Sequence, residues 1–161
     1  IVETEAYAGI EDKASHAYNN KRTQRTNPMY QNGGISYIYL CYGTYYLFNI
    51  VTNIKNIPHA VLIRAIEPLD GVDKMISRRK IKSIKYNLTN GPGKLTIALG
   101  IDKNLNGTSL SSRKIWIQDN GIRFRKKDIL SSTRIGVDYA KEDSKLLYRF
   151  YIKNNKWVSK I

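Results

Sequence analysis

The sequence contains a single cysteine, Cys41, and only two histidines. One cysteine excludes an internal disulfide, and the spacing of cysteine and histidine suggests no metal site. Cys41 lies in an apolar run, which is more typical of a small buried side chain than of a nucleophile. We therefore expect no metal and no other cofactor.

Long hydrophobic runs are also absent. The longest apolar stretch, residues 35–51, is shorter than the roughly 20 residues that a membrane helix requires, and it contains five tyrosines. No basic leader followed by an apolar segment marks the chain for secretion. The first residue, Ile1, opens directly on a strand pattern, so we expect the natural protein to carry a further amino-terminal segment.

Acidic residues are few. The chain has 27 Lys and Arg against 13 Asp and Glu, which gives a formal net charge of +14 and a pI of about 9.9. Such a charge favours a polyanionic partner, most often a nucleic acid. A length of 161 residues is typical of one domain, so we assign residues 1–161 to a single domain.

The most distinctive stretch is the tyrosine-rich segment 35–49. Residues 35–41 alternate and favour a strand, Gly43 permits a turn, and the strand pattern resumes at Tyr45. The two halves are predicted to pair as a β-hairpin with Tyr42 near its tip. Each tyrosine taken singly fits a half-buried sheet, but five of them in a basic chain indicate a surface for stacking.

Two further strands carry charge. In residues 1–7 the period of two places Glu3, Glu5 and Tyr7 on one face. An acid near a nucleic-acid surface repels phosphate, so it is either remote from the ligand or kept for chemistry. Arg64 interrupts an apolar strand at 60–66 and needs an anionic partner, either a carboxylate such as Glu5 or a phosphate.

The remaining elements are predicted more coarsely. A helix is expected over 69–79, and a loop at 90–94 leads into a second helix at 95–100, where backbone amides and Lys94 offer a seat for a phosphate. Residues 114–118 and 122–124 resemble a strand pair turned at Asp119-Asn120-Gly121. Residues 134–137 read as a short extended piece, and 147–153 as a strand. His16, taken alone, is more typical of a structural histidine.

An ordered set of motifs closely resembles the alkyladenine (3-methyladenine) DNA glycosylase family over nearly the whole chain. The matching motifs are Ile-Val-Glu-Thr-Glu-Ala-Tyr at 1–7, His16, Tyr37-Ile-Tyr39, Tyr42-Gly43, Asn49, Arg64-Ala-Ile-Glu-Pro68, Asn-Gly-Pro-Gly-Lys at 90–94, Arg134-Ile-Gly-Val137 and Arg149-Phe-Tyr151. Thr44 departs from the bulkier apolar residue found beside the wedge in some relatives.

This resemblance implies base excision repair of damaged purines. Tyr42 would be the wedge that fills the gap left by a flipped base. The base would stack between Tyr7 and Tyr39 with His16 across from it, and Asn49 at the pocket floor would resist the 2-amino group of guanine.

The resemblance also implies the chemistry. Glu5 would activate a water that attacks the deoxyribose, Arg64 would hold the carboxylate and the water, and the carbonyl of Ile135 would bind the water. We expect phosphate contacts from Gly93 and Lys94, and a structural role for Glu3. The expected enzyme is a monofunctional, monomeric glycosylase without lyase activity. It needs no obligate protein partner or membrane and acts on double-stranded DNA inside the cell.

Two other functions are compatible with parts of the pattern. A non-catalytic nucleic-acid-binding module of the same fold would share the charge and the tyrosines, but it has no use for a carboxylate such as Glu5. A carbohydrate hydrolase could use Glu3 and Glu5, roughly 6.5 to 7 Å apart at their Cα atoms, as acid and base. The charge of +14 argues against neutral sugars. The predicted fold is a single α+β domain with a curved, mostly antiparallel sheet, short surrounding helices and a protruding aromatic hairpin.

Overall fold

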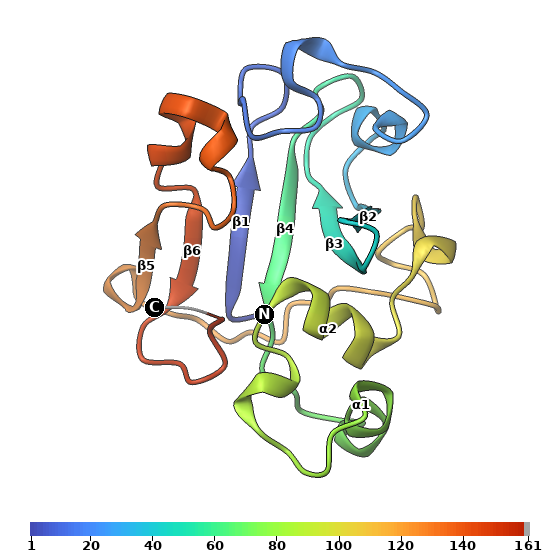
Figure 1. Ribbon diagram of the computed structural model, residues 1–161, viewed down its shortest axis with the longest axis vertical. Helices are drawn as coiled ribbons and strands as arrows, with labels where there is room; N and C mark the ends of the chain where they lie inside the picture. Colours follow the sequence, from blue (N-terminus) through green and yellow to red (C-terminus); the bar gives the residue numbers. More distant parts are fainter. Residues whose placement is uncertain (160–161) are drawn as a thin grey trace.

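A computed structural model describes residues 1–159. Its centre is a six-stranded sheet in the order β2-β3-β4-β1-β6-β5, in which every neighbouring pair is antiparallel (Figure 1). The strands are β1 (Glu3–Tyr7), β2 (Ile35–Cys41), β3 (Tyr45–Val51), β4 (Ala60–Ala65), β5 (Ile129–Ser132) and β6 (Arg149–Ile152). The predicted α+β class with a mostly antiparallel sheet is confirmed.

Helices are short and lie around the sheet. The α-helices are α1 (Val72–Arg79) and α2 (Pro92–Leu99). The 3-10 helices are η1 (Tyr18–Asn20), η2 (Asn27–Tyr30), η3 (Tyr86–Leu88), η4 (Lys103–Leu105), η5 (Lys126–Asp128) and η6 (Asp138–Lys145). No helix within residues 1–159 is long and apolar enough to cross a membrane.

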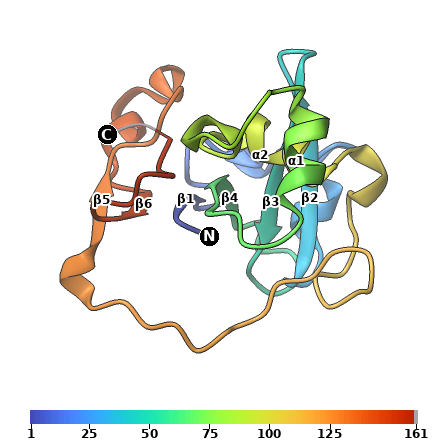
Figure 2. The same cartoon turned by 90° about the horizontal axis from the view of Figure 1, so that it is seen from below.

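The two faces of the sheet bury different segments. On one face Ile38, Phe48 and Ile63 pack with Leu95 of α2 in a buried cluster. Figure 2 shows α1 and α2 together on one side of the β3 and β4 strands. On the opposite face Tyr37 packs with buried residues of the segment 17–30. The alternation of β2 therefore directs the neighbouring Tyr37 and Ile38 into two separate cores.

Strands β2 and β3 pair antiparallel, from Ile35 opposite Val51 to Cys41 opposite Tyr45, with Tyr42 in the turn between them. Helix α1 begins later than predicted, because Gly71 adopts a left-handed conformation with φ of 71° at the N-cap. Helix α2 begins earlier, with Pro92 in its first turn, and ends at Gly100 as predicted.

The predicted strand pair at 114–118 and 122–124 is wrong. Residues 117–125 form no strand, although Asp119 does accept the amide of Gly121 in a local turn. Ile122 and Phe124 are 67% and 48% exposed, so neither flank has a core to pack against. The predicted extended piece at 134–137 is a bend at Gly136, and strand β5 before it was not predicted.

Candidate active site

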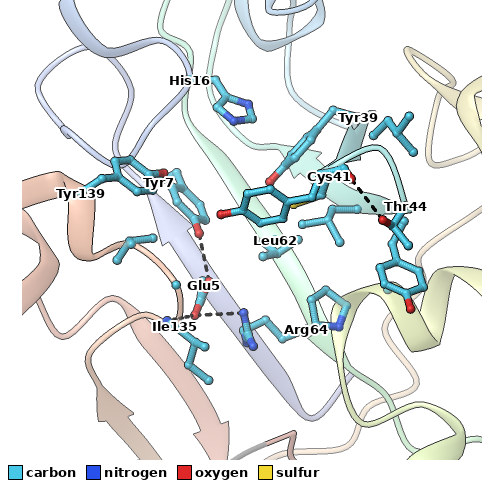
Figure 3. A pocket seen from close by; sticks show the side chains of 18 of the residues that line it. Glu5, Tyr7, His16, Tyr39, Cys41, Thr44, Leu62, Arg64, Ile135 and Tyr139 are labelled. Atoms are coloured by element: carbon cyan, nitrogen blue, oxygen red, sulfur yellow. Dashed lines mark hydrogen bonds and ion pairs between the residues drawn. The ribbon is translucent and has the colours of Figure 1, made fainter.

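A cavity of about 670 Å³ opens beside the β2–β3 hairpin and the carboxyl half of β1 (Figure 3). It brings together most of the residues that the sequence singled out. The predicted residues that line it are Glu5, Tyr7, His16, Tyr39, Tyr42, Arg64, Gly93 and Ile135. In Figure 3, Glu5 and Arg64 lie at one end of the cavity, Tyr7 and Tyr39 on opposite sides, and His16 at the other end.

The sheet register places these side chains on one face. One row across five strands reads Tyr37, Asn49, Leu62, Glu5 and Arg149, each opposite the next. Side chains directly opposite one another in antiparallel strands point to the same face. The period of two therefore aligns residues of β1, β2 and β3 that are distant in sequence.

Glu5 is fully buried, and its carboxylate accepts two hydrogen bonds and forms one ion pair. Its Oε1 accepts the amide of Ile135 at 2.7 Å and lies 3.2 Å from Nη1 of Arg64. Its Oε2 accepts the hydroxyl of Tyr7 at 3.0 Å. A buried carboxylate without such partners would be strongly destabilising, so these bonds are what keeps a charge at the cavity wall.

Glu3 anchors the same network from beneath the cavity. Its Oε1 accepts hydrogen bonds from Nε of Arg64 at 2.9 Å, from Nε of Arg149 at 2.8 Å and from the hydroxyl of Ser159 at 2.8 Å. Its Oε2 accepts a hydrogen bond from the amide of Ser159 at 2.6 Å. Burial opposes ionisation of Glu3, but the hydrogen bonds from Ser159 and Arg149 outweigh it and lower the pKa of this carboxyl. Arg64 thus pairs with both acids of the strand. The interrupted apolar run of β4 had left a carboxylate or a phosphate open as its partner.

Tyr7 is supported on its outer side by a second buried ion pair. The guanidinium carbon of Arg134 lies 4.8 Å from the centre of the Tyr7 ring. Asp12 accepts both terminal nitrogens of Arg134, at 2.5 and 2.8 Å. Burial, and then the nearby Glu5 carboxylate, raises the pKa of the Tyr7 phenol, so the hydroxyl is protonated and donates.

His16 is neutral and held in one tautomer. Burial, with Arg25 and Lys21 adding to it, lowers the pKa of His16 to about 4. Nη2 of Arg25 is 3.4 Å from Nε2, and because a guanidinium can only donate, Nε2 is the acceptor. Nδ1 then carries the proton and donates to the hydroxyl of Tyr37 at 2.8 Å. The imidazole also meets the Tyr39 ring edge-on, with centroids 4.5 Å apart.

Asn49 is not among the residues that line the main cavity. It lines a small adjoining hollow of about 30 Å³ together with Tyr7, His16 and Tyr39. Asn49 is buried, and its Nδ2 donates to the carbonyl of Tyr37 at 3.1 Å. The amide is therefore fixed relative to the aromatic side chains.

Tyr42 occupies the turn between β2 and β3 and is 94% exposed. Its φ is 49°, in the left-handed region that non-glycine residues rarely adopt, and Gly43 follows with φ of 69°. The hydroxyl of Thr44 donates to the carbonyl of Tyr42 and closes the turn. A large apolar ring held in solvent by a strained turn is unexplained by folding alone.

The predicted phosphate seat lies next to the cavity. A hollow of about 400 Å³ is lined by Arg64, Arg79, Lys94 and the backbone of Gly93, with no acidic side chain among its lining residues. Lys94 is half-buried and donates to Oδ1 of Asn90 at 2.9 Å. Lys94 therefore lines this hollow and not the main cavity.

The lining residues that were not predicted from the sequence include three with polar or charged side chains that bear on the site. Arg25 stacks over the Tyr39 ring at 4.9 Å, Tyr139 donates from its hydroxyl to the carbonyl of Ala14, and Arg79 lines the basic hollow. Arg25 lies in the polar and basic segment 19–34, and a basic segment of this length was a usable signal. Tyr139 and Arg79 are distant from the hairpin in sequence, and no sequence pattern indicated that they line the site. Among residues 1–159, no group of three or more His, Cys, Asp and Glu side chains is placed to hold a metal ion.

Comparisons with known proteins agree on one family. A family model described as methylpurine-DNA glycosylase matches residues 1–156. Three relatives carry the name "Putative 3-methyladenine DNA glycosylase". The protein of Clostridium novyi (strain NT) is 48% identical over 167 residues, covering 99% of this chain and 82% of the relative. That of Natranaerobius thermophilus is 49% identical over 161 residues, covering 99% and 81%, and that of Chlamydia felis (strain Fe/C-56) 51% identical over 157 residues, covering 97% and 79%.

Proposed function

The chain belongs to the methylpurine-DNA glycosylase family, and we propose that it removes alkylated or deaminated purines from double-stranded DNA by hydrolysing the N-glycosidic bond. One observation carries the proposal. A fully buried, multiply hydrogen-bonded carboxylate, Glu5, faces a cavity that is walled by aromatic rings and opens beneath an exposed tyrosine. That combination suits a base removed from the helix and a water activated beside it.

Tyr42 serves as the wedge. An enzyme that acts on a base must take it out of the stack, and an inserted side chain fills the gap that the base leaves. The exposure of Tyr42 and its place at the rim of the cavity support this role. Thr44 beside it is small, so we expect it to affect DNA binding more than cleavage.

The extruded base stacks in the cavity between Tyr7 and Tyr39, with His16 at one end. Electron-poor, damaged purines gain more from stacking on phenol rings than ordinary purines do. The neutral His16 can present its main-chain amide to the base edge without adding a charge. Asn49 lies behind these rings, and we assign it to the exclusion of the 2-amino group of guanine.

Glu5 acts as the general base. The oxygen of a water bonds to C1′, one water proton passes to the carboxylate, and the bond from C1′ to the purine nitrogen breaks with its electron pair on the purine. An alkylated, cationic purine leaves as a neutral base, whereas hypoxanthine leaves as an anion that takes a proton from solvent. The charge of Glu5 also stabilises the positive character that develops at the sugar. Arg64 and the carbonyl of Ile135 hold the water.

The hollow beside the cavity receives a phosphate of the DNA backbone. Its lining cations Arg79 and Lys94, and the amino end of α2 at Gly93, support this assignment. Each phosphate contact contributes to the salt dependence of binding, so Lys94→Gln is expected to reduce the slope of log affinity against log salt by about 0.9. Binding to lesion DNA at several salt concentrations measures this slope. An unchanged slope would remove Lys94 from the interface.

The enzyme is monofunctional and leaves an abasic site. A lyase needs an amine to attack the sugar, and no lysine is among the residues that line the main cavity. It acts as a monomer on DNA inside the cell. Strand cleavage by the purified protein, without alkali, would contradict the assignment.

The deciding experiment is single-turnover release of hypoxanthine and of alkylated adenine from a duplex with one lesion. We expect the parent to release base and Glu5→Gln to bind the same duplex but release it at least about 100-fold more slowly. The matched control is Glu142→Gln, because Glu142 is an exposed glutamate paired with Lys13 and absent from the cavity lining. The control is expected to keep the parent rate. If the parent and Glu5→Gln both bind DNA and neither releases base, the chain is a binding module.

A further inference from the structure

The hydrogen bond between Tyr7 and Glu5 joins the proposed stacking surface to the proposed base. We propose that the hydroxyl of Tyr7 is a positioning group that fixes the Glu5 carboxylate and makes Oε2 the atom that accepts the water proton. The inference rests on the proposed function and adds to it a second task for Tyr7, separate from stacking.

The two oxygens of the Glu5 carboxylate have different numbers of neighbours. A carboxylate offers about four lone-pair sites, two on each oxygen. Oε1 accepts a hydrogen bond from the amide of Ile135 at 2.7 Å and also faces the cation of Arg64, whose Nη1 lies 3.2 Å away in an ion pair, so both of its sides are occupied. Oε2 accepts the Tyr7 hydroxyl alone, at 3.0 Å, from among the residues that the structure describes. One site therefore stays open on Oε2, and the water must donate to it.

The carboxylate must also be kept from rotating. A rotation about the bond from Cγ to Cδ moves both oxygens, and the contacts of Oε1 with Ile135 and Arg64 resist it from one side only, so a second restraint on Oε2 is needed to hold the plane of the carboxylate. The phenol supplies that restraint, and its raised pKa, caused first by burial and then by Glu5, keeps the proton on the tyrosine. The hydroxyl can therefore donate to Glu5 but cannot take over as the base.

Tyr7 is itself held by its neighbours. Its ring rests on the guanidinium of Arg134 at 4.8 Å, and Arg134 is held by Asp12 through two hydrogen bonds. Arg134 also donates to the carbonyl of Ala6, in the same strand as Tyr7. The Tyr7 ring is thus packed against Arg134, and its hydroxyl donates to Glu5. Stacking of the base and orientation of Oε2 depend on one rigid side chain.

The test separates the hydroxyl from the ring. Tyr7→Phe keeps the stacking surface and removes the donor, so it should bind lesion DNA like the parent and release base slowly. Hydrogen bonds to charged groups are worth enough to predict a single-turnover rate about 10- to 100-fold lower, with DNA affinity within about two-fold. Tyr7→Leu, which removes the ring as well, should lose both rate and affinity.

A matched control is available in Tyr30→Phe. Tyr30 is also a buried phenol, donates its hydroxyl to Asn20 at 3.2 Å and lies under the guanidinium of Arg22 at 4.9 Å, but it is not among the residues that line the cavity. Its substitution should leave both rate and affinity unchanged. Urea denaturation of each variant shows that the comparison is made between folded proteins.

Two outcomes would overturn the inference. If the parent releases base and Tyr7→Phe does so at the same rate, Ile135 and Arg64 suffice to orient Glu5. If Tyr7→Phe loses affinity and its rate at saturating protein is normal, the hydroxyl serves binding. A folded parent that binds lesion DNA but releases no base would instead refute the proposed function, and the positioning role with it.

Discussion

Arg64 binds Glu3 through Nε at 2.9 Å, and this pairing directs the rest of its guanidinium toward the cavity, where Nη1 lies 3.2 Å from Glu5. Glu3 is thereby the ion-pair partner of a residue at the proposed active site. Neutralising a carboxylate that is fully buried beside cations removes part of their charge compensation and is costly.

Glu3→Gln is therefore expected to destabilise the fold. The substitution keeps the shape of the side chain but removes a negative charge that both Arg64 and Arg149 contact, and breaking such a buried pair typically costs about 3 to 5 kcal/mol. Urea denaturation measures the loss. The control, Glu142→Gln, removes an exposed partner of Lys13 and should leave the denaturation curve unchanged. Equal curves for the two variants would contradict the structural role of Glu3.

Stability should depend on pH through His16. Its folded-state pKa of about 4 is below the value of about 6.5 for an unfolded histidine, so the unfolded chain binds the proton first as pH falls. The contribution is complete above pH 6.5 and is lost progressively down to about pH 4. We expect a loss of about 1 to 3 kcal/mol over this window, and a smaller loss in His16→Gln. Denaturant unfolding between pH 7 and 4.5 makes the comparison. Parallel curves for the two proteins would show that His16 is not the group responsible.

Tyr42→Ala should separate binding from folding. Because the ring is 94% exposed, its removal is expected to change the free energy of unfolding by less than about 0.5 kcal/mol. Loss of one stacked ring should weaken binding to lesion DNA by about 1 to 3 kcal/mol. Fluorescence anisotropy with a labelled duplex measures the affinity. Trp116→Ala, which removes another ring that is 60% exposed but lies outside the cavity lining, should bind normally. An equal loss in both variants would argue against a specific wedge.

Replacement of Gly93 by a larger residue is predicted to lower the stability of the fold while Tyr45 is present. A Cβ at this position would lie 2.8 Å from Cγ and 2.9 Å from Cβ of Tyr45, so Gly93→Ala must push the ring away from helix α2. Overpacking of this kind costs about 1 to 3 kcal/mol, which thermal or urea unfolding can resolve. In a Tyr45→Ala background the space is free, and adding Gly93→Ala should cost much less. Additive losses would show that the clash is not the cause.

Local patterns in the sequence determined the β2–β3 hairpin and which residues share a face of a strand. Alternation and a glycine at the turn specify β2, β3 and the exposed position of Tyr42, because these depend on neighbours within a few residues. The period of two also placed Glu3, Glu5 and Tyr7 on one face of β1. The interrupted apolar run of β4 indicated that Arg64 needs an anionic partner, and the structure supplies two carboxylates.

Tertiary structure alone decided which groups meet. The turn signal at 119–121 was real, but it produced no hairpin because its flanks found no core, whereas β5, with a weak pattern of its own, formed on the edge of β6. The amide of Ile135 reaches Glu5 across 130 positions of sequence, and Arg134 reaches Asp12 across 122. Such contacts depend on how strands and loops pack once the chain has folded. The sequence by itself supplied the chemical groups, and the three-dimensional packing assigned each donor to its acceptor.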